Sequence, residues 1–121
     1  MIDHLTLHVS DVAKSKAFYA AALAPLGYAV VMDLGTYVGL GVAGKPDFWL
    51  APGGPARPQL HLAFHAASHA QVDAFHAAAL EAGATDNGAP GLRPQYHPSY
   101  YGAFVFDPDE QNIEAVAHRP E

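Results

Sequence analysis

Hydrophobic and polar positions alternate over residues 2–9, at the start of the chain. This two-residue period is typical of a β-strand with one apolar and one polar face. The polar face carries His4, Thr6 and His8, whereas leucine and valine occupy the other face. The pattern therefore predicts a strand that places two histidines on the same side of a sheet.

The spacing of apolar residues then lengthens and predicts a helix over residues 12–26. Ser10 and Asp11 are favourable N-caps for this helix, and Gly27 is a favourable residue to end it. Three shorter segments, bounded by glycine and proline, predict strands over residues 28–33, 36–42 and 47–51. The first part of the chain thus has the order βαβββ.

The second part of the chain repeats the first. HLTLHVSDVAKSKAFYAAAL, which begins at His4, returns 57 positions later as HLAFHAASHAQVDAFHAAAL, which begins at His61. The elements expected here are a strand over 59–65, a helix over 68–82, a weak strand over 84–87, a loop over 88–99, and strands over 100–106 and 111–117. We therefore predict an α+β fold of two tandem βαβββ modules, residues 1–52 and 58–118, in a single domain that spans residues 1–121.

Composition narrows the range of partners. The net charge of −6, with six Lys plus Arg, leaves no basic stripe for nucleic acid. No window approaches the roughly 20 apolar residues of a membrane span, and the chain opens on a strand pattern rather than on a basic, apolar leader, so we expect a cytoplasmic protein. With zero cysteines, any metal must be held by nitrogen and oxygen atoms.

Three pairs of polar residues, each four positions apart, occupy one face of a predicted strand. Partners four apart along a strand lie roughly 13 Å from each other, so only one of each pair can bind a given metal ion. The two possible sets are His4, His61 and Glu114, or His8, His65 and His118. We favour the first set, because two imidazoles and one carboxylate form a three-ligand site that leaves positions open for water and substrate. The alternative is that these histidines line a polar interior and bond only to water or backbone.

The loop before the last two strands concentrates groups that suit a polar ligand. We name His97 and Tyr101 as candidate catalytic residues, since an imidazole transfers protons well at neutral pH. The candidate substrate-binding residues are Thr6, Trp49, Arg93, Tyr96 and Tyr100. The alternative is that this proline-flanked aromatic loop only covers a barrel mouth or forms a dimer contact.

Both ends of the chain resemble the vicinal oxygen chelate superfamily, which includes glyoxalase I, extradiol dioxygenases, fosfomycin-resistance transferases and bleomycin-resistance proteins. The resemblance lies in IDHLTLHVSDVAKSKAFYAAALAPLGY at the start and YYGAFVFDPDEQNIEAV at the end. It implies two modules that form a half-open curved barrel with the helices outside. It also implies a divalent metal ion (Fe, Mn, Zn or Ni) on His4, His61 and Glu114, a small-molecule substrate, and a homodimer.

Two positions depart from the superfamily pattern. The fourth ligand position falls at Trp49, and an indole cannot ligate a cation, which argues against a strict lactoylglutathione lyase. Glu110 stands where the turn usually has glycine, which predicts either some strain or a different turn type.

The sequence therefore predicts a metal-dependent enzyme that chelates two neighbouring oxygens of a small substrate. Lyase, isomerase, dioxygenase and thiol-transferase reactions all remain open. The alternative function is non-catalytic binding of a small molecule or antibiotic, as in proteins similar to bleomycin-resistance proteins. The net charge of −6 fits this function as well.

Overall fold

The structure is a computed structural model that describes residues 1–121. The elements in chain order are β1 (Leu5–His8), α1 (Val12–Ala22), the 3₁₀ turn η1 (Ala24–Leu26), β2 (Ala29–Asp33), β3 (Val38–Val42), β4 (Lys45–Ala51), β5 (His61–His65), α2 (His69–Glu81), β6 (Thr85–Leu92), β7 (Tyr101–Phe106) and β8 (Asn112–Ala117). The predicted α+β fold of two tandem βαβββ modules is confirmed. Neither helix combines the length and the apolar character needed to cross a membrane.

Each module forms its own four-stranded sheet, and the two sheets share one topology. The strand orders are β1-β4-β3-β2 and β5-β8-β7-β6. In both sheets the first strand pairs parallel with the last one, and the remaining pairs are antiparallel. The first strand of each module therefore lies at a sheet edge, beside the strand that ends the module.

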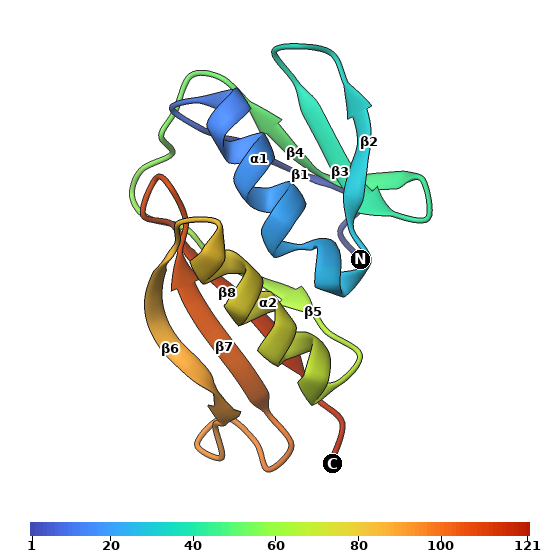
Figure 1. The fold of residues 1–121 in the computed structure, drawn as a ribbon, viewed down its shortest axis with the longest axis vertical. Coiled ribbons are helices and arrows are strands. Elements are labelled where there is room, and N and C mark those ends of the chain that lie inside the picture. The colour runs from blue at the N-terminus through green and yellow to red at the C-terminus, as the bar shows by residue number, and fades with distance from the viewer.

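Both helices lie on the same side of the two sheets (Figure 1). Figure 1 shows α1 in front of the first sheet and α2 in front of the second, and the two helices also contact each other. The ring of Phe48 in β4 packs edge-on against Phe64 in β5, with centroids 5.2 Å apart. The modules thus share one apolar core on the helix side, and no helix covers the opposite face of either sheet.

The first helix is shorter than predicted. The predicted range of 12–26 is wrong at its end, because α1 stops at Ala22 and a separate 3₁₀ turn follows. Pro25 lies in that turn, and proline has no N–H with which to continue α-helical hydrogen bonding. The predicted N-cap is correct, since the Asp11 side chain accepts from the Lys14 amide, whereas Gly27 ends the 3₁₀ turn, with a φ of 91°, rather than the helix.

The strand β6 is longer than predicted. We expected a weak strand over 84–87 and then a loop, but β6 continues to Leu92 and pairs with β7. The pairing register shifts on both sides of Gly88. Glycine and proline suggest a loop in a sequence, yet an edge strand accommodates both residues at bulges.

The turn between β7 and β8 fastens the second module to the first. Asp107 is buried and accepts hydrogen bonds from the Tyr19 hydroxyl of α1 and from the backbone amides of Asp109 and Gln111. Asp109 accepts from both the amide and the hydroxyl of Ser10, just before α1. These two residues join the modules.

Glu110 has the left-handed φ of 66° that its position in this turn suggested. A side chain at such a φ is strained relative to glycine. Its carbonyl accepts a hydrogen bond of 2.6 Å from the side chain of Gln59, just before β5.

The buried carboxylate of Asp107 makes stability depend on pH. Burial raises its pKa above the ordinary value, and the hydrogen bond from Tyr19 and those from two backbone amides partly oppose that shift. Because the pKa is higher in the folded state, the contribution of this group is most favourable below the unfolded-state pKa. That contribution is lost as the pH rises through the folded-state pKa.

Tyr19→Phe removes one of the three donors and so raises the pKa of Asp107 further. We expect the free energy of unfolding, measured by urea denaturation, to fall by about 1–3 kcal/mol at pH 7 and by less at pH 4. The matched control is Tyr28→Phe, whose hydroxyl donates to the exposed Asp47. Equal losses for Tyr19→Phe at the two pH values would contradict this account.

Candidate functional site

A histidine and a buried carboxylate meet on the open face of the second sheet. His61 begins β5 and Glu114 lies in the adjacent strand β8. His61 Nε2 donates to Glu114 Oε1 at 2.9 Å. The Glu114 side chain is 1% exposed, whereas that of His61 is 53% exposed. Since Ile113 and Ala115 point into the core on the helix side, Glu114 points the other way.

The second oxygen of the same carboxylate accepts a hydrogen bond from Tyr100. The Tyr100 hydroxyl donates to Glu114 Oε2. Partial burial, followed by this hydrogen bond, raises the pKa of Tyr100 well above its ordinary value. A small cavity of about 330 Å³ lies over the pair and is lined by His61, Tyr96, Tyr100, Phe104 and Glu114. The cavity therefore combines aromatic walls with one nitrogen atom and one oxygen atom that could bind a metal ion.

The His61–Glu114 pair has the donor chemistry and spacing that suit a divalent cation. Two donors that each lie about 2.1 Å from one ion, at a right angle to each other, are roughly 3.0 Å apart. The observed separation between Nε2 and Oε1 is 2.9 Å. One imidazole and one carboxylate therefore fit two of the three positions of the predicted ligand set.

The third predicted ligand lies in the other module. His4 precedes β1, is exposed, and its Nδ1 lies 2.8 Å from the carboxylate of Asp3, whose pKa this contact lowers. No group of three or more histidine and acidic side chains lies close enough to hold a metal within this chain. The structure therefore brings His61 and Glu114 together and leaves His4 apart from them.

The alternative set of histidines is also dispersed. The Nδ1 of His8 donates to the carbonyl of Pro52 at 2.8 Å, in the first module. His65 ends β5 beside Val116, and His118 hydrogen-bonds to His97. None of the three lies with the other two.

The two sheets show how the repeated modules have diverged. Thr6 pairs in register with Trp49, and Ala63, at the repeat-equivalent position of Thr6, pairs with Glu114. Trp49 is thus the counterpart of Glu114 in the first module. The end of its indole covers Gly39, where a Cβ would lie only 2.9–3.0 Å from three ring atoms. Thr6 and Trp49 therefore share the open face of the first sheet, and their role in substrate binding stays a prediction.

His97 is held in one tautomer by its neighbours. Its Nδ1 accepts from the Ser99 amide at 3.1 Å, so a neutral His97 carries its proton on Nε2. That proton is donated to Nδ1 of His118 at 2.7 Å. Both nitrogens of His97 are therefore engaged, and the exposed outer nitrogen of the pair is Nε2 of His118.

Two other candidate residues make no hydrogen bond to the carboxylate of Glu114. The guanidinium of Arg93 donates to the carbonyls of Gly91 and Ala89, and it lies 5.4 Å from the centre of the Phe104 ring. Tyr101 lies on the helix side of the sheet, where its hydroxyl donates to Asp73 of α2 at 2.7 Å. That hydrogen bond raises the pKa of Tyr101 to about 12.

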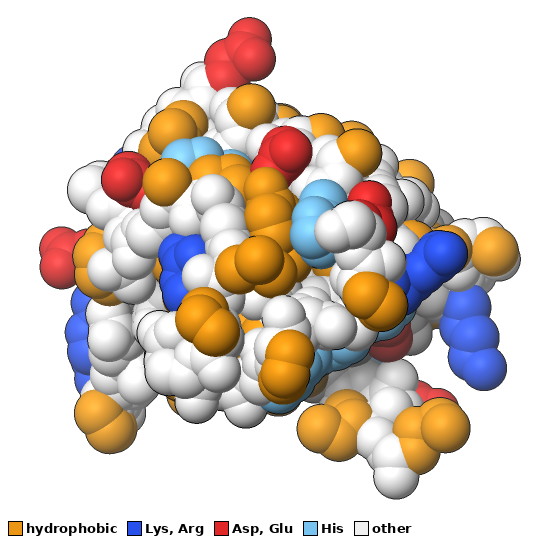
Figure 2. Space-filling model, turned by 90° about the horizontal axis from the view of Figure 1, so that it is seen from below, with side chains coloured by type: hydrophobic (Ala, Val, Ile, Leu, Met, Phe, Trp, Pro, Cys, Tyr) orange, Lys and Arg blue, Asp and Glu red, His pale blue; other side chains and the backbone are white.

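Sequence reasoning missed Phe104, which forms one wall of the small cavity. Phe104 pairs in register with Glu114, so the two side chains share a face of the sheet. Side chains alternate between the two faces of the predicted strand over 100–106. Once Glu114 is chosen as a ligand, this alternation indicates that Phe104 lies on the same face as Glu114. Figure 2, which looks at the molecule from below, shows hydrophobic, histidine, acidic and basic side chains intermingled on that face of the molecule.

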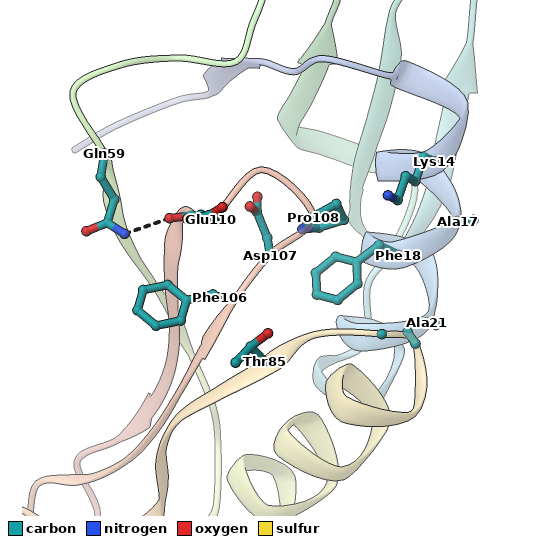
Figure 3. Close-up of a pocket in the computed structure, with 12 residues that line it drawn as sticks. Lys14, Ala17, Phe18, Ala21, Gln59, Thr85, Phe106, Asp107, Pro108 and Glu110 are labelled. Atoms are coloured by element: carbon teal, nitrogen blue, oxygen red, sulfur yellow. Dashed lines mark hydrogen bonds between the residues drawn. The ribbon is translucent and has the colours of Figure 1, made fainter.

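A larger cleft lies elsewhere, between the modules. It has a volume of about 1020 Å³ and is lined by α1, by the start of β6 and by the turn that contains Asp107. Figure 3 shows Phe18 and Phe106 along it, with Lys14 at one side and the hydrogen-bonded Gln59 and Glu110 at the other. Its most buried acid, Asp107, already has its oxygens occupied by structural donors. The smaller cavity therefore has the better donor chemistry.

Comparison with known proteins identifies the family. The Glyoxalase/Bleomycin resistance protein/Dioxygenase superfamily matches residues 1–115. The chain belongs to this superfamily. A search of curated proteins found no match. The superfamily match agrees with the two βαβββ modules, and the resemblance drawn from the two ends of the sequence is confirmed.

Several solved structures have the same fold. A glyoxalase/bleomycin resistance protein from Albidiferax ferrireducens is 30% identical, with 95% of this chain and 97% of that chain covered and a TM-score of 0.80. A putative glyoxalase from Bacillus halodurans is 26% identical, with 97% and 95% covered and a TM-score of 0.72. The fosfomycin resistance protein FosX from Listeria monocytogenes is 20% identical, with 98% and 93% covered and a TM-score of 0.73, a likeness that shows the fold alone.

Gly39→Ala tests whether the indole of Trp49 packs on Gly39. A Cβ at this position overlaps the indole, so the ring must lift from β3 toward solvent. Since Trp49 is the only tryptophan of the chain, we expect intrinsic fluorescence to shift to longer wavelength. Gly91→Ala in the second module is the control, because its Cβ would meet only the flexible Arg93 side chain. An unchanged fluorescence wavelength in Gly39→Ala would contradict this packing of the indole on Gly39.

Proposed function

We propose that this superfamily member is a divalent-metal-dependent enzyme that binds two neighbouring oxygens of a small substrate. The observation that carries the proposal is the His61–Glu114 pair, in which a nearly inaccessible carboxylate shares an open cavity with an imidazole nitrogen 2.9 Å away. Buried carboxylates are uncommon unless they are paired or bind a metal. The nitrogen and oxygen donors suit Fe, Mn, Zn or Ni.

We further propose that a second copy of the chain supplies His4, so that the working enzyme is a homodimer. The chain holds the two-residue half of the site on its second sheet, and it holds His4, Thr6 and Trp49 on the first module. Because no helix covers the open faces of the two sheets, the first sheet of one copy can face the second sheet of another. In a twofold dimer this arrangement forms two equivalent sites.

Each group then has a distinct role. The ion would act as a Lewis acid that stabilises negative charge developing on the chelated oxygens. Tyr96 and Phe104 form apolar walls for the body of the substrate, and Thr6 and Trp49 of the second copy close the opposite side. Because neutral His97 donates from Nε2 to Nδ1 of His118, the exposed Nε2 of His118 carries a proton that it can donate in a hydrogen bond to a substrate oxygen.

Mixing two variants tests both the ligand set and the shared site. His4→Ala and Glu114→Gln each remove one donor, so we expect each purified variant to lose bound metal. When their subunits exchange fully, half of the dimers are mixed, and each mixed dimer regains one intact site. About one quarter of the sites should therefore bind metal again, as measured by elemental analysis after dialysis against Co²⁺.

His76→Ala is the matched control, because this histidine pairs with Asp86 elsewhere on the second module and should leave metal content unchanged. Wild-type protein that holds no metal would contradict the proposed function. Mixed variants that recover nothing would contradict the shared site. Full metal content in His4→Ala would remove His4 from the ligand set.

A further inference from the structure

Both oxygens of the Glu114 carboxylate have a partner, and the two partners differ in kind. Oε1 accepts from His61, an exposed side chain that can turn toward a ligand. Oε2 accepts from the Tyr100 hydroxyl, which belongs to the residue that ends the loop before β7. If His61 turns to bind an ion, Glu114 still has one fixed contact. The hydroxyl proton of Tyr100 is therefore engaged with the carboxylate and is not free to be donated to a substrate.

The local backbone makes room for this contact. Gly102 lies beside it, and a Cβ there would lie 3.0 Å from Glu114 Oε2 and 3.2 Å from the Tyr100 ring. Both distances are tighter than ordinary van der Waals contact. A larger residue at this position would push the hydroxyl and the carboxylate apart.

Tyr100 is held by both its backbone and its ring. The backbone carbonyl of Tyr100 accepts from the Arg93 amide at 2.7 Å, and the backbone amide of Tyr100 donates to the His97 carbonyl at 3.2 Å. Three other rings pack edge-on against the Tyr100 ring. Their centroids lie 4.9 Å (Tyr96), 5.4 Å (His97) and 5.3 Å (His118) from the Tyr100 centroid. The hydroxyl consequently reaches Glu114 from a rigid support rather than from a mobile loop.

We propose that Tyr100 is a positioning residue that holds Glu114 in the orientation needed for metal binding, through its hydrogen bond to Oε2. This inference rests on the proposed function. A ligand carboxylate that is free to rotate must lose that freedom when the ion binds, whereas a carboxylate already held by a partner does not. Tyr100 thus acts through Glu114, in contrast to the substrate contact that the sequence suggested.

Co²⁺ titration of three tyrosine variants tests the role. We expect Tyr100→Phe to bind Co²⁺ about 10- to 100-fold more weakly than wild type by calorimetry, with a changed visible absorption spectrum of the bound ion. Tyr96→Phe and Tyr101→Phe are matched controls. Tyr96 lines the same cavity without a hydrogen bond to Glu114, and Tyr101 faces α2. Both controls should keep wild-type affinity, and circular dichroism should show all variants folded.

A double-mutant cycle on the metal-free protein shows whether Tyr100 acts through Glu114. Tyr100→Phe and Glu114→Gln remove the two ends of one hydrogen bond, so their effects on the free energy of unfolding should not add. Fully additive losses would overturn the inference.

The outcomes separate this inference from the function on which it rests. Wild type that binds Co²⁺ while Tyr100→Phe binds it equally well overturns the positioning role alone. Wild type that binds no Co²⁺ contradicts the metal-dependent function, and the positioning role is lost with it. Weaker binding in all three tyrosine variants would show a general loosening of the loop and would also overturn the specific role of Tyr100.

Discussion

The hydrogen bonds of Asp107 and Asp109, together with the shared apolar core, join the two modules. One carboxylate binds the Tyr19 hydroxyl inside the core, and the other binds Ser10 ahead of α1. These contacts draw the end of the second module onto the first helix. The helix sides of both sheets therefore share one core, and their opposite faces stay open. Everything proposed for this chain depends on those two open faces.

The repeat explains why the site is asymmetric. At equivalent places the modules carry Trp49 beside Gly39 and Glu114 beside Phe104. In each pair one residue is large and the other is smaller, so the two faces stay similarly filled while their chemistry differs. The second module offers a carboxylate, and the first offers an indole surface. A single module could not supply both the carboxylate and the indole surface at this one position, whereas the duplicated chain supplies both.

The sequence predicted well what local periodicity controls. Alternation at the strands, the caps at Asp11 and Gly27, and the repeat itself gave the elements and their order. It failed where tertiary contacts override local preference, as at the bulges around Gly88 that keep β6 paired. Contacts between distant residues were predicted only in part: the pairing of His61 with Glu114 followed from family resemblance and strand phase, whereas the link between His97 and His118 did not. The separation of His4 from its expected partners depends on how the modules dock, which no local pattern encodes.

The central claim is that His61 and Glu114 of one copy and His4 of another hold one metal ion. Anomalous X-ray diffraction from crystals of Co²⁺-loaded protein tests it most directly. The account predicts one peak per chain, with Nε2 of His61 and Oε1 of Glu114 about 2.1 Å from it, and with His4 of a second copy as the third protein ligand. A peak ligated by other residues, a His4 ligand from the same chain, or no peak in loaded crystals would contradict the claim.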